Sequence, residues 1–193
     1  MREIISHPGK PLIVHLQKVA RLCKESVSQS HFDLGINKEL LQKLAFIQGA
    51  VHDIGKASNN FQTYIHSGGE LIIRPKHHAL ISAYLAKLIA EQYLQEHPLP
   101  SWDRKILPYF LFTSVKRHHG NVRNFSDELE SLSEKEEDLK VLRANFPDEQ
   151  VQEILNTLLA EIDFHFSHYL FNVPPYAENN NAKHKAAIGN IHI

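Results

Sequence analysis

The chain has 193 residues, 42% hydrophobic and 22% charged, a balance that predicts one globular domain with a hydrophobic core. Its formal net charge of −1 excludes the strongly basic character of proteins that hold nucleic acid through many phosphate contacts. A single cysteine, Cys23, excludes an internal disulfide and favours a reducing, cytoplasmic setting. The N-terminus lacks the apolar region of a signal peptide, and no apolar run is long enough to span a membrane.

Apolar residues at helical spacing dominate the first half of the chain. The first predicted helix carries a one-face pattern at Leu12, Leu16, Val19, Ala20 and Cys23. A second helix is expected over residues 38–53. Asn59 and Asn60 then predict a turn before a short helical segment at residues 61–66.

The second half continues the helical pattern. Pro75 predicts the start of a third helix that reaches about residue 96. Ser101 as the N-cap and Gly120 as the terminating residue predict a fourth helix through His119.

The C-terminal part is less regular. The acidic stretch over residues 127–140 is interpreted as a solvated helical face or an insert, and a last helix is expected from Pro147 to about Phe166. Periodicity ends at residue 172. The sequence therefore predicts an all-α fold, a single helical bundle over residues 1–171 followed by an irregular tail over residues 172–193.

Histidine is over-represented, with 14 copies. The most informative string is His52-Asp53-Ile54-Gly55-Lys56, which ends the second predicted helix. An adjacent His-Asp pair can place both side chains on a divalent metal only if the backbone bends, and Gly55 is expected to permit that bend. Lys56 could neutralise a phosphate or orient an attacking water, so Asp53 and Lys56 are the expected catalytic residues.

Four predicted helices or helix ends offer metal ligands of the same kind, imidazole nitrogen or carboxylate oxygen. They are His15, His52, Asp53, His78, His118 and His119. Helix bundles build metal sites from inward-facing side chains of this sort. A shared carboxylate suits two metals about 3.5–4 Å apart, which generate a hydroxide and clamp both oxygens of a phosphoryl displacement. With no thiolate, this set favours two divalent transition-metal ions (Mn, Ni, Co or Fe), with Mg possible.

Each residue taken singly has a structural alternative. His15 could be an ordinary helix histidine, and His77 is a rival for the role of His78. The pair at residues 118–119 could simply favour the negative end of a helix dipole. Ser82 is a candidate substrate contact whose alternative is a local hydrogen bond. Seven other histidines are interpreted as surface or core residues: His31, His66, His97, His165, His168, His184 and His192.

Together these motifs resemble the HD phosphohydrolase superfamily and, more closely, the HD nuclease domain of the CRISPR-associated Cas3 proteins. The resemblance spans about residues 10–125 and is carried by residues 52–58, Phe61-Gln62, residues 78–83 and residues 116–120. It implies metal-dependent cleavage of single-stranded DNA in CRISPR interference, together with a Cas3-type helicase and an RNA-guided surveillance complex.

The resemblance also implies the role of each matched residue. One metal would be held by His15, His52 and Asp53. The second would be held by Asp53, His78, His118 and His119. Lys56 would assist at the scissile phosphate.

The chain departs from the family pattern in two ways. The family usually adds a late metal-ligating aspartate; here Asp163 is the candidate, and Asp127, Asp138 and Asp148 lie in unfamiliar contexts. No helicase phosphate-binding motif is present, so we expect a stand-alone HD subunit or the N-terminal piece of a longer protein. Two alternatives stay open: an HD phosphohydrolase of nucleotides or cyclic nucleotides, and a truncated, non-catalytic docking subunit.

Overall fold

The computed structural model describes residues 3–31, 35–71, 78–121, 144 and 146–166. These residues are mainly helical, with one small two-stranded sheet. The α-helices are α1 (Leu12–Gln29), α2 (Lys38–Val51), α3 (Asn59–His66), α4 (His78–Gln95), α5 (Ser101–Lys116) and α8 (Asp148–Leu159). Two short 3-10 helices follow α2 and α8: η1 (Ile54–Ala57) and η3 (Ala160–Ile162). The predicted all-α class is confirmed.

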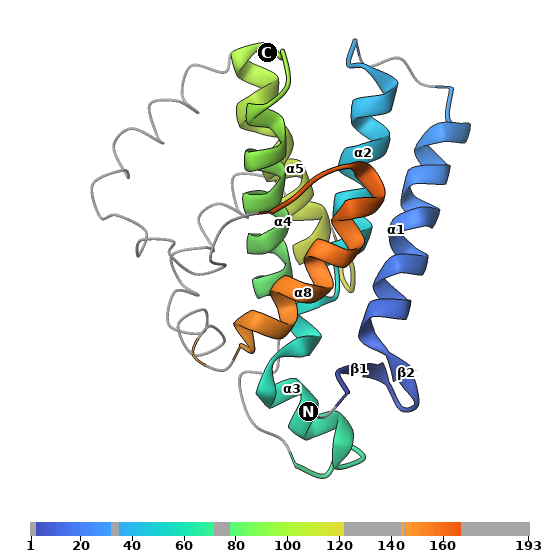
Figure 1. Ribbon diagram of the computed structural model, residues 1–193, viewed down its shortest axis with the longest axis vertical. Helices are drawn as coiled ribbons and strands as arrows, with labels where there is room; N and C mark the ends of the chain where they lie inside the picture. Colours follow the sequence, from blue (N-terminus) through green and yellow to red (C-terminus); the bar gives the residue numbers. More distant parts are fainter. Residues whose placement is uncertain (1–2, 32–34, 72–77, 122–143, 145, 167–193) are drawn as a thin grey trace.

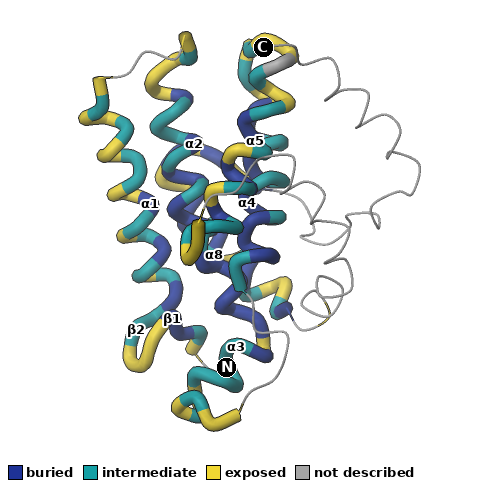
Figure 2. Tube along the Cα trace, turned by 180° about the vertical axis from the view of Figure 1, so that it is seen from behind, coloured by how far each residue is buried: buried dark blue, intermediate teal, exposed yellow. Residues whose placement is uncertain are grey.

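Two helix pairs form the body of the molecule. Helix α1 packs along α2, α4 packs along α5, and contacts between α2 and α4 join the pairs (Figure 1). Helix α8 crosses this layer and contacts both α1 and α2. The buried residues line the inner faces of these helices and form one continuous cluster (Figure 2). Its largest fully buried side chains are Phe46, Phe112 and Phe166.

A short hairpin precedes α1. Strand β1 (Ile5–His7) pairs antiparallel with β2 (Lys10–Pro11), and Gly9 adopts a positive φ of 72° in the turn. This hairpin was not predicted from the sequence, because strands of two or three residues are too short to show an alternating pattern. Helices α1 and α4 begin, and α2 and α5 end, at the hairpin end of the bundle (Figure 1). This arrangement brings four helix ends to one place.

The start of α3 differs from the prediction. Asn59 and Asn60 do not form a turn but are the first residues of the helix. Ser58 is the N-cap, and its hydroxyl accepts the N–H of Phe61 at 3.4 Å. The serine hydroxyl satisfies a backbone N–H that has no partner within the helix. The helix can therefore begin at Asn59, closer to the HD string than predicted.

Helix α5 also differs at both ends. Pro100 is its N-cap and Ser101 its first residue, and the helix ends at Lys116, with Arg117 as the C-cap. The predicted end at His119 is therefore three residues too late. His118 and His119 therefore lie beyond the end of the helix, and the directions of their side chains are not set by helical spacing.

The last helix is shorter than predicted. Helix α8 ends at Leu159, and η3 then tightens the chain before Asp163, which has a left-handed φ of 57°. The predicted helix start at Pro75, the acidic stretch at 127–140 and the boundary at residue 171 lie outside the described residues. None of the described helices combines the length and hydropathy that a membrane span requires.

Candidate metal centre

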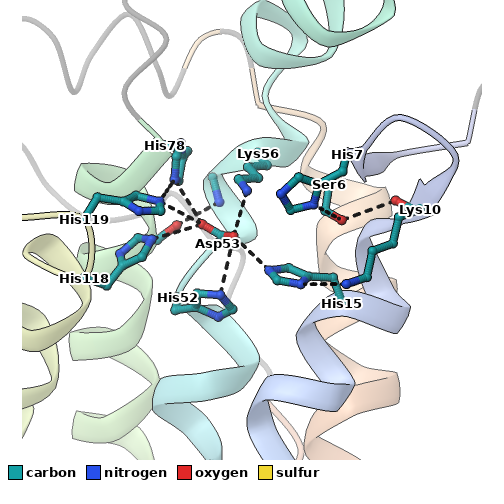
Figure 3. A network of polar contacts seen from close by, with 12 residues as sticks. Ser6, His7, Lys10, His15, His52, Asp53, Lys56, His78, His118 and His119 are labelled. Atoms are coloured by element: carbon teal, nitrogen blue, oxygen red, sulfur yellow. Dashed lines mark hydrogen bonds and ion pairs between the residues drawn. The ribbon is translucent and has the colours of Figure 1, made fainter.

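The site forms where the four helix ends meet. His15 lies in the first turns of α1, His78 is the first residue of α4, and His52 is the C-cap of α2. The pair at residues 118–119 follows directly after α5. All of these side chains point toward the carboxylate of Asp53 (Figure 3). The structure thus brings together all residues of the two predicted ligand sets.

Asp53 is the centre of the cluster and is only 3% exposed. Its Oδ2 lies 2.9 Å from Nε2 of His15, 3.4 Å from Nε2 of His52 and 2.8 Å from Nζ of Lys56. A buried carboxylate is costly unless it is paired, so the lysine and the imidazoles compensate for its burial.

The other oxygen, Oδ1, faces a second set of imidazoles. It lies 3.0 Å from Nε2 of His78, 3.1 Å from Nε2 of His118 and 3.9 Å from Nε2 of His119. The Nε2 atoms of His78 and His119 are 3.1 Å apart.

The ligand atoms therefore fall into two groups that share one carboxylate. Within each group the atoms lie no more than 4.8 Å apart: His15, His52 and Asp53 in one, Asp53, His78, His118 and His119 in the other. These members are the same as in the two predicted ligand sets. Imidazole nitrogen and carboxylate oxygen without thiolate suit first-row divalent metals.

Backbone carbonyls fix two of the rings. Nδ1 of His52 donates to the carbonyl of Gly49 at 2.7 Å, and Nδ1 of His118 donates to the carbonyl of Val115 at 2.6 Å. A neutral imidazole carries one N–H, so each Nε2 then turns a lone pair toward Asp53. Metal-ligating histidines are commonly oriented in this way by a hydrogen bond from the other ring nitrogen.

The surroundings keep Asp53 ionised. Burial alone would raise its pKa, but the close contacts with His118, His52, His78 and Lys56 hold the pKa far below its usual range. Burial lowers the pKa of His15, of His78 and of His119 below 6.5. At neutral pH these rings are uncharged, and each has a lone pair for a metal.

His118 behaves differently from the other rings. Burial would lower its pKa, but the Asp53 carboxylate and the Val115 carbonyl outweigh burial and raise it. This ring therefore binds a proton more readily than an ordinary histidine does. A proton on Nε2 satisfies the carboxylate in the way that a metal ion would.

Gly55 serves the site by its lack of a side chain. It is not among the positive-φ glycines of the described residues, so the turn from α2 into η1 does not use the left-handed region at this position. A Cβ there would lie 2.2 Å from the carbonyl oxygen of His78 and 2.5 Å from Cγ2 of Ile81. The glycine lets η1 approach the first turn of α4, which sets His78 against Asp53.

Ser82 lies behind the cluster. It is fully buried, and its hydroxyl accepts the N–H of Gly55 at 2.9 Å. The hydroxyl is thus engaged by the backbone of η1, 27 positions away in the sequence, and not by a local hydrogen bond. The bond attaches η1 to α4 a second time.

Lys56 is buried beside Asp53. Its ammonium group lies 5.7 Å from the ring centroid of Phe61 in addition to its contact with the carboxylate. Its carbonyl accepts from Nε2 of Gln62 at 2.7 Å. The side chain is thus held by its neighbours at the edge of the metal-ligand groups.

Sequence reasoning missed the hairpin residues beside the cluster. Nζ of Lys10 lies 3.5 Å from Nδ1 of His15, and the rings of His7 and His15 meet edge to face at 5.5 Å between centroids. Ser6 and His7 contact each other at 3.2 Å (Figure 3). Gly9, directly before the helix that carries His15, was the one residue in the sequence that could have indicated a turn there.

Asp163, the candidate for a late metal ligand, is not in either ligand group of the described residues. It is exposed and follows η3, where Glu161 pairs with Arg21 of α1 at 2.8 Å. Of the other late aspartates, Asp148 begins α8, and Asp127 and Asp138 lie outside the described residues.

The helical fold and the His-Asp pair at the meeting point of its helices define the class of HD-type metal-dependent hydrolases. A family model described as "Cas3, HD domain" matches residues 6–187, and the chain belongs to this family. Its function is accordingly CRISPR-associated and connected with nucleic acid. Searches of curated proteins and of solved structures gave no match.

Proposed function

We propose that this chain is a metal-dependent nuclease that cleaves single-stranded DNA in CRISPR interference, together with a Cas3-type helicase and an RNA-guided surveillance complex. The observation that carries the proposal is the sharing of one buried carboxylate, Asp53, by two groups of imidazole nitrogens. A shared carboxylate is the usual bridge in two-metal phosphodiester hydrolysis.

The donor set fits divalent cations. With Nδ1 of His52 bound to the Gly49 carbonyl, a neutral ring directs the lone pair of Nε2 at Oδ2 of Asp53 from 3.4 Å. Two facing lone pairs repel each other unless a positive charge lies near both. A cation bound by the nitrogen and the oxygen removes this repulsion.

We assign His15, His52 and Asp53 to one metal ion and Asp53, His78, His118 and His119 to a second. When bound, the ions supply an activated water and neutralise charge on the phosphate. The ligand types favour Mn, Ni, Co or Fe, with Mg possible.

Lys56 is proposed to hold the substrate phosphate. Its ammonium group lies 2.8 Å from Asp53, so it is already in contact with the proposed bridge between the ions. A non-bridging phosphate oxygen placed there would gain a charge-assisted hydrogen bond as negative charge develops.

The position of His119 favours a long substrate over a small one. Its side chain is 61% exposed, whereas that of Asp53 is 4% exposed, so the ligand cluster reaches the surface on one side. An open edge suits a polynucleotide, and a nucleotide phosphohydrolase would need an enclosed pocket.

A substrate comparison tests the proposal. Purified chain is supplied with Mn²⁺, Ni²⁺, Co²⁺ or Mg²⁺ and offered a labelled single-stranded oligonucleotide, its duplex, a nucleoside monophosphate and a cyclic nucleotide. Cleavage of the single strand in preference to the other three is the expected result. Hydrolysis confined to the small substrates would instead favour the nucleotide phosphohydrolase. If the folded chain hydrolysed none of the substrates, the docking subunit would be favoured.

We further propose that residues 1–171 carry the domain and residues 172–193 form its tail. The chain's net charge of −1 supports dependence on partners, because weak general attraction for DNA leaves strand delivery to other proteins. The single cysteine supports action in the reducing cytoplasm.

A further inference from the structure

The β1–β2 hairpin brings a second lysine to the site. Lys10 is the first residue of β2, and its side chain extends toward His15 (Figure 3). Its Nζ lies 3.5 Å from Nδ1 of His15, longer than the 2.7–3.2 Å of a normal N–H hydrogen bond. An ammonium group has three donors, and this long contact satisfies them poorly.

The charge balance of the site favours an anion. Among the residues labelled in Figure 3, Asp53 carries the one negative charge, and the ammonium groups of Lys10 and Lys56 carry two positive charges. The cluster is positive even when every histidine is neutral, and bound metal ions would add to this charge. A chain of net charge −1 thus concentrates positive charge at one place.

We propose that Lys10 contacts a DNA phosphate that flanks the scissile one. This inference rests on the proposed function. The imidazole ring of His15 separates the two positions, because Nε2 faces Asp53 and Nδ1 faces Lys10. The ammonium group of Lys10 is therefore one ring width beyond the metal-ligand cluster, and the proposal places the next phosphate of the strand there.

The hairpin is held in place for this contact. The side-chain amide of Gln62 acts as a strand partner for Ile5, accepting its N–H at 3.1 Å and donating to its carbonyl at 2.9 Å. The same amide donates to the carbonyl of Lys56. Gln62 thereby ties both lysine-bearing segments together, and their spacing is set before substrate binds.

Ser6 fixes the other edge of the hairpin. It is 1% exposed, and its hydroxyl donates to the carbonyl of Lys10 at 3.3 Å. The backbone of Lys10 is therefore anchored while its side chain, which is partly exposed, keeps access to solvent. This combination is what a substrate contact requires.

The test measures the salt dependence of DNA binding. Fluorescence anisotropy follows a labelled single-stranded oligonucleotide in EDTA, where metal-dependent cleavage is off, for wild type, Lys10→Ala, Lys10→Arg and Lys18→Ala. Lys18 is exposed on α1, so its replacement removes the same charge from the neighbouring helix. Metal binding by each variant is measured in parallel by calorimetry.

We expect Lys10→Ala to weaken binding roughly threefold to tenfold and to reduce the slope of log K against log salt by about 0.7, the value for one phosphate contact on a single strand. Lys10→Arg should keep the slope, Lys18→Ala should leave it unchanged, and metal binding should survive in all three.

Two results would overturn the inference alone. One is an unchanged salt slope in Lys10→Ala while wild type binds and cleaves the strand. The other is a loss of metal affinity in Lys10→Ala without a change of slope, which would make Lys10 a positioning residue for His15. A wild-type chain that neither binds nor cleaves DNA overturns both this inference and the proposed function.

Discussion

At the scale of single residues, the cluster depends on how each imidazole is oriented. His118 is anchored by the Val115 carbonyl and lies 3.1 Å from Asp53, whereas His119 is 3.9 Å away and largely exposed. An anchored ring loses less freedom when it binds a metal than an exposed one does. The two neighbours should therefore contribute unequally.

His118→Ala should lower the affinity for Mn²⁺ by about 10–100-fold, and His119→Ala should lower it less. Isothermal titration calorimetry measures both. His97→Ala is the matched control, because Nδ1 of His97 also bonds a carbonyl, that of Tyr93, but outside the ligand groups. Equal losses in His118→Ala and His97→Ala would contradict the assignment of His118.

The ligand residues could be predicted from the sequence because their chemistry is local. The HD string and the paired histidines are visible as letters, and metal binding needs those side-chain types. The contributions of Lys10 and Gln62 were not predictable in this way. A lysine and a glutamine have many ordinary roles, and here their roles follow from folded-state contacts with residues 5 and 57 positions away, respectively.

At the scale of elements, the contact between η1 and α4 positions His78. Its tolerance is small, because a Cβ on Gly55 would meet backbone as close as 2.2 Å. Backbone cannot move aside as a flexible side chain can. A change that separates η1 from α4 should therefore also disrupt the metal site.

Gly55→Ala should lower the free energy of unfolding by about 2 kcal/mol or more through overpacking. Urea denaturation of the metal-free chain measures this change. Gly120→Ala is the control, because a Cβ there meets nothing within 4 Å. The close-approach account would be wrong if both variants were as stable as wild type.

A second element contact depends on pH. Glu161 of η3 bonds Arg21 and Gln17 of α1, and the hydrogen bond from Arg21 lowers the pKa of this carboxyl below 4.5. A lowered folded-state pKa means that the contribution is present above about pH 4.5 and is lost as pH falls through the folded value.

Glu161→Gln should therefore reduce stability at pH 7 by about 0.2–1 kcal/mol, the size of an exposed ion pair, and by much less near pH 3. Thermal unfolding at both pH values measures this difference. Glu153→Gln, at an exposed position of α8, removes the same charge as a control. An effect of Glu161→Gln that did not change with pH would exclude the ion pair as its cause.

Element boundaries were harder to predict than the elements. Apolar periodicity indicated α1, α2 and α8 because each buries one face, with Leu12, Leu16 and Ala20 inward on α1. The end of α5 was placed three residues late, since His118 and His119 leave the helix to meet Asp53. A tertiary contact decides that boundary, and no local signal encodes it.

At the scale of the whole molecule, the site joins four helices that are distant in sequence. His15, His78 and His118 come from different helices or helix ends, and all three contact the carboxylate of Asp53, which follows α2. A cation bound there links these segments in the folded state and finds no such arrangement in the unfolded chain.

Metal should therefore stabilise the fold. At a free Mn²⁺ concentration about 100 times Kd, each site should add about 2.7 kcal/mol. For a chain of this length that corresponds to a rise in Tm of about 5–10 °C, which EDTA should reverse. Differential scanning calorimetry measures the rise, and an unchanged Tm at saturating metal would contradict binding at the helix junction.

The most direct test of the account is the rate at which Asp53→Asn cleaves single-stranded DNA with Mn²⁺, compared with wild type. The substitution keeps the shape of the side chain and removes the charge that both ligand groups share. With circular dichroism showing both proteins folded, we predict cleavage by wild type and a loss on the order of 10³-fold or more in the variant. Equal rates for the two proteins would show that the hydrolysis does not depend on this carboxylate, and the central claim would be wrong.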